Sequence, residues 1–271
     1  MRSDPRAFDA VPEAPPAAPR LWRALLRAPL LAIVAVVGLP VLLLALLPGV
    51  RDIAVSGQPI ALRVQRRYAR ILLRTLGYRL RLHGGLPERP GLIVANHISG
   101  FDIPVLHAVA PLWLVAKQDI HDWPLIGFLA RAVGTIFIQR GSEPSRKRAA
   151  RRMAALLRAG RIVGVFPEGG IHLPRGVGRF HPRLFGPAIR AGAPVLPVAI
   201  RYWRAGDLHG EQVFGPGMKF SQLVVAALGR PPCDVQVLIG EPLASVGASR
   251  NDLARDAQRQ VTEMYCRVDG H

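Results

Sequence analysis

Short apolar runs alternate with segments of helical periodicity along most of the chain. The runs lie at 92–95, 112–116, 134–140, 161–166, 194–202 and 234–239. Each is too short for a helix and several are rich in β-branched residues, which indicates buried strands. Helical periodicity occupies 121–134, 145–160 and 251–267. This alternation predicts an α/β fold, with a mostly parallel or mixed central sheet flanked by helices and a site at the strand ends.

The segment 145–160 has the most complete helix signals. Ser145 is placed as its N-cap, Gly160 as its terminator, and Ala149, Met153, Leu156 and Leu157 form an apolar stripe. The opposite face is basic, with arginines at 148, 151, 152 and 158. We therefore expect a surface helix that packs on the sheet through the stripe.

The N-terminal part has a different pattern. Residues 28–47 contain no charged side chain, and these 20 positions are about the length a helix needs to cross a bilayer. A cleaved signal peptide fits less well, because the run is too long and no small-x-small cleavage site precedes Arg51. Gly38 and Pro40 are expected to kink the helix or turn it back, so spanning and re-entrant arrangements both remain open. Before it, residues 1–27 form a basic, Pro-rich tail that we expect to be disordered.

A second helix is expected at 61–76, where basic and apolar residues separate onto two faces. The basic face carries Arg63, Arg66, Arg67, Arg70 and Arg74, and the apolar face carries Val64, Tyr68, Ile71 and Leu72. This pattern is typical of a helix in a membrane interface, where each arginine contributes about 1 kcal/mol. The alternative is an ordinary amphipathic helix that packs on its own core and leaves its arginines in solvent.

Charge and composition favour a membrane partner. The 36 Lys and Arg against 18 Asp and Glu give a net charge of +18, which attracts nucleic acid or an anionic bilayer. A mean hydropathy of +0.22 and only 6% aromatic residues argue against a nucleic-acid binder. The arginines are more numerous after the apolar segment, so we expect the inner (cytoplasmic) membrane, with the globular part facing the cytoplasm. Cys233 and Cys266 follow neither a disulfide nor a zinc pattern.

Candidate chemistry follows the first strand, in the sequence GLIVANHISGFDIP at 91–104. His97 follows the strand, and Asp102 with Pro104 indicates the start of a helix. A strand, turn and helix start can bring these side chains together, and a carboxylate that holds one imidazole nitrogen makes the other a better general base. The alternative is that Asp102 only caps the helix and His97 is a turn residue.

Other strand ends carry candidate binding groups. Arg140 ends the run at 134–140, where a guanidinium group could hold a phosphate. Glu168 is followed by Gly169 and Gly170, which let the backbone approach a ligand closely or simply form a turn.

Four segments resemble, in their order along the chain, the motifs of the glycerolipid acyltransferases of the 1-acylglycerol-3-phosphate acyltransferase type. They are NHISGFD, GTIFIQR, FPEGG and VLPVAIRY, and the resemblance covers about Gly91 to Leu243. It implies transfer of an acyl group from acyl carrier protein or coenzyme A to the free hydroxyl of a lysolipid. By this resemblance, His97 is the general base, Asp102 orients it, and Arg140, Glu168 and Gly169 hold the head group of the acceptor. Pro197 would shape the site, and no cofactor or metal is implied.

The resemblance also implies a division into three parts. Residues 28–80 would be membrane-attachment helices that contact phospholipids, and 81–271 the acyltransferase domain. We expect direct attack by the hydroxyl without a covalent acyl-enzyme, because no serine or cysteine lies in a nucleophile motif. Backbone N–H groups at the helix opened by Asp102 would stabilise the oxyanion.

The third motif departs from the family pattern. Thr or Ser and then a basic residue usually follow FPEG, whereas Gly170, Ile171 and His172 follow here. Arg175 or Arg179 could supply the missing charge. The expected acceptor is 1-acylglycerol-3-phosphate, giving phosphatidic acid, with lyso-ornithine lipid as the alternative. A thioester hydrolase and a non-enzymatic membrane-binding or nucleic-acid-binding protein are the alternatives outside this class.

Overall fold

A seven-stranded mixed sheet forms the centre of the protein. The computed structural model describes residues 20–55, 58–86, 90–122, 126–171, 176–203 and 220–267. The strands are β3 (Tyr78–His83), β4 (Leu92–Ala95), β5 (Leu112–Lys117), β6 (Ile136–Ile138), β7 (Ile162–Val165), β8 (Val195–Trp203) and β9 (Cys233–Ile239), in the order β3-β9-β8-β4-β7-β5-β6. Only the β8–β9 pairing is antiparallel within this sheet. The expected mixed α/β fold is therefore confirmed, and β4, β5, β6 and β7 all end at one edge.

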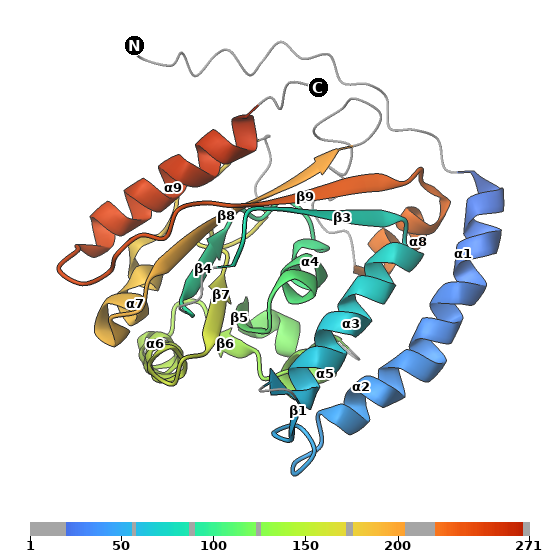
Figure 1. Ribbon diagram of the computed structural model, residues 1–271, viewed down its shortest axis with the longest axis horizontal. Coiled ribbons are helices and arrows are strands. Elements are labelled where there is room, and N and C mark those ends of the chain that lie inside the picture. Colours follow the sequence, from blue (N-terminus) through green and yellow to red (C-terminus); the bar gives the residue numbers. More distant parts are fainter. Residues whose placement is uncertain are drawn as a thin grey trace.

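Helices cover both faces of the sheet and enclose two cores (Figure 1). One core lies under α3 (Ile60–Thr75), α4 (Asp102–Val109) and α8 (Phe220–Gly229). The other lies under α6 (Glu143–Arg158), α7 (Gly186–Ala191) and α9 (Arg250–Cys266). The shorter elements are β1 (Ala54–Val55), β2 (Gln58–Pro59), η3 (Gln118–Asp122), α5 (Ile126–Ala132) and η4 (Pro182–Phe185). The expected helix at 121–134 is divided between η3 and α5, and residues 123–125 lie outside the described residues.

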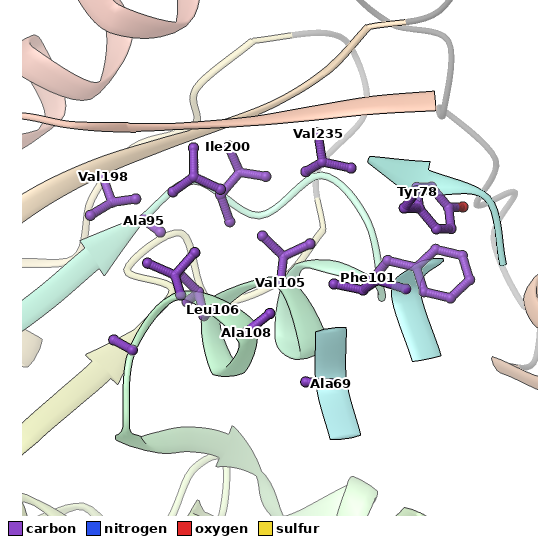
Figure 2. Packing of buried hydrophobic residues seen from close by; sticks show 14 of the residues in the cluster. Ala69, Tyr78, Ala95, Phe101, Val105, Leu106, Ala108, Val198, Ile200 and Val235 are labelled. Atoms are coloured by element: carbon purple, nitrogen blue, oxygen red, sulfur yellow. The ribbon is translucent and has the colours of Figure 1, made fainter. Parts of the chain in front are cut away.

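Helix α4 is held between the sheet and α3. Val105 and Leu106 of α4 face Val198 and Ile200 of β8 in Figure 2, and Ala108 lies toward α3. Just before the helix, Phe101 packs against Tyr78 with ring centroids 4.7 Å apart. This packing fixes the start of α4, where Asp102 is the first helical residue.

The N-terminal apolar segment forms one long helix that runs beside the sheet and its covering helices. It consists of α1 (Leu21–Ile33), the π-helical turn η2 (Val34–Gly38) and α2 (Leu39–Ala45). The Leu39 N–H bonds to the Val34 carbonyl, so the wider turn comes just before Pro40, which has no N–H to donate. The helix is therefore not turned back at Gly38. By length and hydropathy, Leu21–Ala45 could cross a membrane, because its most apolar 18-residue window has a mean hydropathy of 2.7 and is only 17% buried.

Arg27 attaches this helix to the body. Its Nη1 donates to the carbonyl oxygens of Ala227, Leu228 and Arg230 at the end of α8, over 3.1, 3.3 and 2.7 Å. The guanidinium group lies against Gly77, where φ is +90° and an added Cβ would come within 2.3 Å of Nη2. Residues 20–27, expected in a disordered tail, are therefore part of the ordered structure, whereas 1–19 lie outside the described residues.

Helix α3 packs on the protein core, as the alternative interpretation proposed. Its buried stripe is Ala61, Gln65, Ala69 and Leu73, which differs from the expected apolar face. Tyr68, expected in the membrane interface, lies instead against Gly38 of the N-terminal helix. The guanidinium Nε atoms of Arg66 and Arg70 both donate to the Ala108 carbonyl at the end of α4.

Two boundaries differ from the sequence prediction. The expected start of the globular domain at residue 81 falls inside β3, a strand whose apolar positions 78, 80 and 82 alternate with polar ones. Helix α6 begins at Glu143, and its N-cap is Ser142, whose Oγ accepts from Ser145 N. Ser145 is buried within the helix, and its own Oγ accepts from Gln139 N, which explains why a serine is suitable there.

Candidate active site

His97 follows β4 at the edge where the parallel strands end. Asn96 precedes it and is fully buried. The Asn96 amide bonds to both backbone groups of Ile200 in β8, with its Nδ2 3.0 Å from the carbonyl and its Oδ1 2.8 Å from the N–H. The side chain thus continues the pairing of β4 with β8 for one more position and fixes where His97 leaves the sheet.

The Asp102 carboxylate meets His97 directly. Its Oδ2 lies 2.9 Å from His97 Nδ1 and also accepts from the backbone N–H groups of Ile98 and Ser99, both at 2.8 Å. Its Oδ1 accepts from the Tyr202 hydroxyl at 2.8 Å. Asp102 is fully buried, so these bonds replace the water it has lost. The capping alternative does not describe Asp102, because its donors precede the helix.

This arrangement sets the tautomer of His97. A carboxylate only accepts hydrogen bonds, so Nδ1 carries the proton and Nε2 is left with a lone pair. Within the described residues, none hydrogen-bonds to Nε2, and the His97 side chain keeps 14% of its surface exposed. The imidazole also stacks on Phe166, with centroids 4.1 Å apart and planes 15° apart. The group is therefore held in the orientation that a general base requires.

Tyr202 is a neutral donor to the Asp102 carboxylate. Burial raises its pKa well above the ordinary value of 10.0, and the charge of Asp102 and their hydrogen bond raise it further. The hydroxyl therefore keeps its proton at any pH at which the protein would be assayed. Asn96, Phe166 and Tyr202 were not among the residues that the sequence placed in the site. All three do lie inside the motifs: Asn96 in the first, Phe166 in the third and Tyr202 in the fourth.

Glu168 supports His97 from the end of β7. Its Oε1 accepts from the backbone N–H of His97 at 3.0 Å, and the residue is only 3% exposed. An added Cβ at Gly178 would lie 2.7 Å from Oε2, so the carboxylate is also closely packed. The contact with His97 is thus observed, whereas direct contact of Glu168 with an acceptor head group stays a prediction.

Two cationic side chains lie near the residues that follow β7. Arg140 is exposed, and its Nη2 donates to the Gly169 carbonyl at 3.2 Å. Gly169 has φ +76°, a conformation that favours glycine, and an added Cβ would touch the His181 ring. Lys117 ends β5, where burial lowers its pKa and the charge of Arg140 lowers it further. The effect of the Arg140 charge on Lys117 indicates a shared cationic region that sequence reasoning had not assigned.

The remaining predicted residues lie elsewhere. Pro197 pairs with Val94 inside the sheet, and its carbonyl accepts from Gly240 N, so it lies deeper than His97. Arg179 is exposed, and His172 and Arg175 lie outside the described residues. The part of the chain that the structure describes holds no group of three His, Cys, Asp or Glu residues placed to bind a metal.

Comparisons with known proteins agree with this geometry. The family model described as Acyltransferase matches residues 78–201, from the start of β3 into the fourth motif. The lyso-ornithine lipid O-acyltransferase of Pseudomonas aeruginosa is 40% identical over 205 residues, which cover 75% of this chain and 78% of the relative. The chain belongs to the glycerolipid acyltransferase family.

A further relative carries an acyltransferase name, and a solved structure shares the fold. The 1-acyl-sn-glycerol-3-phosphate acyltransferase of Neisseria gonorrhoeae is 37% identical over 149 residues, which cover 54% of each chain. The chain thus aligns with about half the length of that relative. The crystal structure of the 1-acyl-sn-glycerophosphate acyltransferase PlsC from Thermotoga maritima shares the fold. Its TM-score is 0.65 at 23% identity, over 93% of this chain and 98% of that chain. The protein is a lysolipid acyltransferase, and the non-enzymatic interpretation is wrong.

Proposed function

We propose that the protein transfers a fatty acyl group from an acyl thioester to the free hydroxyl of a lysolipid, with His97 as the general base. The observation that carries this proposal is the 2.9 Å contact between His97 Nδ1 and the buried Asp102 carboxylate. His97 Nε2 takes the hydroxyl proton while the oxygen attacks the thioester carbonyl. The carbon–sulfur bond then breaks, and the thiolate takes up the proton from the imidazolium. Such help typically contributes about 10²- to 10⁴-fold in rate.

Four amides at and just before the start of α4 are already hydrogen-bonded within the protein. Ile98 N and Ser99 N donate to Asp102, Phe101 N donates to Ser99 Oγ, and Asp102 N donates to the Ser99 carbonyl. These four N–H groups hold the carboxylate and the turn in place. Their role is therefore to orient His97, and they are not available to the developing charge on the thioester oxygen.

We assign lyso-ornithine lipid as the acceptor. The P. aeruginosa relative, which covers most of this chain, carries that name. The third motif has Gly170 and Ile171 where the family usually has a hydroxyl and a basic residue, which removes two groups suited to a phosphate. A carboxylate head group needs fewer donors, and Lys117 with Arg140 would provide them. These two cations also suit 1-acylglycerol-3-phosphate, the acceptor predicted from the sequence and named in the Neisseria relative, which is the second candidate.

The N-terminal helix would hold the enzyme on the cytoplasmic face of the inner membrane. Its outward face exposes large apolar side chains at 25, 26, 30, 33, 36, 37, 41 and 44. Its other side lies along α3 and α8 for its whole length (Figure 1). A helix attached to the body in this way would lie in one leaflet, because crossing the bilayer would draw the body into the hydrocarbon.

The test is a product analysis. The full chain is reconstituted in phospholipid vesicles and given labelled acyl thioester with lyso-ornithine lipid, 1-acylglycerol-3-phosphate or no acceptor, and products are identified by mass. Ornithine lipid formation that is lost in His97→Ala supports the proposal, and phosphatidic acid alone would support the second acceptor. Release of free fatty acid at the same rate without any acceptor would identify a hydrolase and overturn the proposal.

A further inference from the structure

An arginine-rich surface lies on the side of the sheet opposite the N-terminal helix. Its members are exposed arginines from four elements: Arg148, Arg151 and Arg152 of α6, Arg183 of η4, Arg190 of α7 and Arg250 of α9. We call these six residues the basic face. Figure 1 shows α6, α7 and the start of α9 at the left, with α1 and α2 at the right.

Contacts join the helices that carry the basic face. Arg190 Nη2 donates to the Ala150 carbonyl at 3.1 Å, which connects α7 to α6. An added Cβ at Gly186 would lie 3.3 Å from Arg250 Cδ and 3.7 Å from Arg190 Nη1, so both side chains lie over Gly186. Arg183 and Arg250 line one cavity of about 350 Å³.

The charge of the basic face is not neutralised within the described part of the protein. The carboxylates at the starts of α6 and α9, Glu143 and Asp252, pair with Lys147 and Arg255 at 2.7 and 2.8 Å. Among the described residues, no carboxylate lies within ion-pair distance of the six guanidinium groups. Three of them share one helix face at spacings of three and four, where like charges repel. An uncompensated cluster of this size fits an anionic partner.

The position of the basic face favours a soluble protein over the bilayer as its partner. The basic face belongs to the side with the α6, α7 and α9 core, whereas the N-terminal helix packs on the α3 and α8 side. A membrane that contacts the exposed apolar face of α1 and α2 therefore lies across the molecule from the basic face. The chemistry of the proposed reaction requires a second substrate besides the lipid, namely a thioester that arrives from solution.

We propose that the basic face docks an acidic acyl carrier protein that delivers the acyl thioester. This inference rests on the proposed function and adds to it the identity of the donor and the surface that receives it. Rows of carboxylates on the carrier would meet the arginines, which speeds encounter and orients the carrier without a large apolar interface. A coenzyme A thioester, which has only its phosphates to offer, would depend on this surface far less.

The experiment compares two acyl donors on the full chain in neutral phospholipid vesicles. The concentrations of hexadecanoyl acyl carrier protein and of hexadecanoyl coenzyme A are varied in turn. The transfer rate is measured for the unaltered enzyme, R148E/R151E/R152E and R151Q/R152Q. We expect the KM for the carrier to rise about tenfold in the triple variant, while kcat/KM for the coenzyme A thioester stays within about twofold. Raising the ionic strength from about 0.05 to about 0.3 M should weaken carrier use by the unaltered enzyme more than by the variant.

The matched control is R255Q/R259Q on α9. It removes the same charge as R151Q/R152Q, but Arg255 and Arg259 already pair with Asp252 and Asp256, so the KM for the carrier should not change. Equal effects on both donors, no effect on either, or weaker binding of the triple variant to anionic vesicles would overturn the inference. An unaltered enzyme that uses only coenzyme A thioesters would also overturn it and leave the proposed function standing. Failure with both donors would reject the proposed function itself.

Discussion

Replacing Tyr202 by Phe removes a single hydroxyl from the support of the catalytic pair. Tyr202 lies in β8 and is 1% exposed, and its hydroxyl donates to Asp102 Oδ1 at 2.8 Å. The substitution keeps the aromatic ring, which lies edge-on to the Tyr78 ring with the two ring centroids 6.0 Å apart. It therefore tests the hydrogen bond and not the packing. Tyr202 reaches no solvent, so we expect it to act only through Asp102.

The size of the effect follows from the number of donors that remain. A hydrogen bond to a charged group contributes about 1.5–3 kcal/mol to stability. Asp102 keeps its hydrogen bonds to the imidazole and to the amides of Ile98 and Ser99, so we expect the lost bond to contribute at the lower end of that range. A loss of about 1.4 kcal/mol in the transition state is tenfold in rate, so kcat should fall about tenfold while both KM values stay unchanged.

The same variant has a predicted pH signature. The raised pKa of Tyr202 means that the unfolded chain loses this proton near pH 10.0 while the folded protein keeps it. The resulting contribution to stability is complete below that pH and is lost as pH rises toward the folded pKa. Tyr202→Phe should therefore lose less stability than the unaltered protein between about pH 9 and pH 11.

Steady-state transfer and urea unfolding in detergent measure both effects. Tyr68→Phe is the matched control, because burial also raises the pKa of the Tyr68 phenol, yet this residue lies on α3 against Gly38. The control should change kcat by less than about twofold. An unchanged kcat in Tyr202→Phe with intact stability, or an equal fall in the control, would refute the reasoning.

Four further predictions follow from the described contacts. His97→Ala and Asp102→Ala should each lower transfer by at least about a hundredfold while flotation with vesicles is unchanged, and an active His97→Ala enzyme would remove the general base from the mechanism. Glu168→Gln should keep most activity, because the amide oxygen still accepts from His97 N, whereas Glu168→Ala should lose about tenfold in kcat; equal losses would argue against this role. Burial lowers the pKa of His107 to about 4. Below pH 6.5 this imidazole is therefore protonated in the unfolded chain but stays neutral in the folded protein. The free energy of unfolding should therefore fall from pH 6.5 toward pH 4, by up to about 3 kcal/mol. In His107→Gln, the free energy measured by urea unfolding should fall less over this pH range than in the unaltered protein. Arg27→Met should free the N-terminal helix from the end of α8 and increase proteolysis there, and an unchanged cleavage pattern would contradict this attachment.

Local pattern was sufficient for most of the sheet. The strands β4 to β9 each lie within an apolar run or extend one residue beyond it, and several of these runs are rich in β-branched residues, so their positions follow from composition. Strand β3 was missed because its alternating apolar and basic residues directly follow the arginine-rich helix and continue the same composition. The face of α3 was assigned wrongly for a related reason. Both of its apolar stripes can be buried, and only the packing of α4 on one side and Gly38 on the other decides which contacts form.

The residues of the active site show the same difference between what the sequence predicts and what it does not. His97 and Asp102 are five residues apart, and a strand, a turn and a helix start are enough to bring them together. Their supports come from far along the chain: Glu168 is 71 residues from His97, and Tyr202 is 100 residues from Asp102. No periodicity encodes which strand lies beside which.

The sequence by itself therefore determined the short-range chemistry, the strands that carry it and the apolar helix at the N-terminus. The tertiary structure alone decided that β7 and β8 flank β4, which places Glu168 and Tyr202 beside the histidine and its carboxylate. The physical reason is that strand order is selected by burial of both sheet faces at once. That is a property of the whole chain, and no single segment of the sequence contains it.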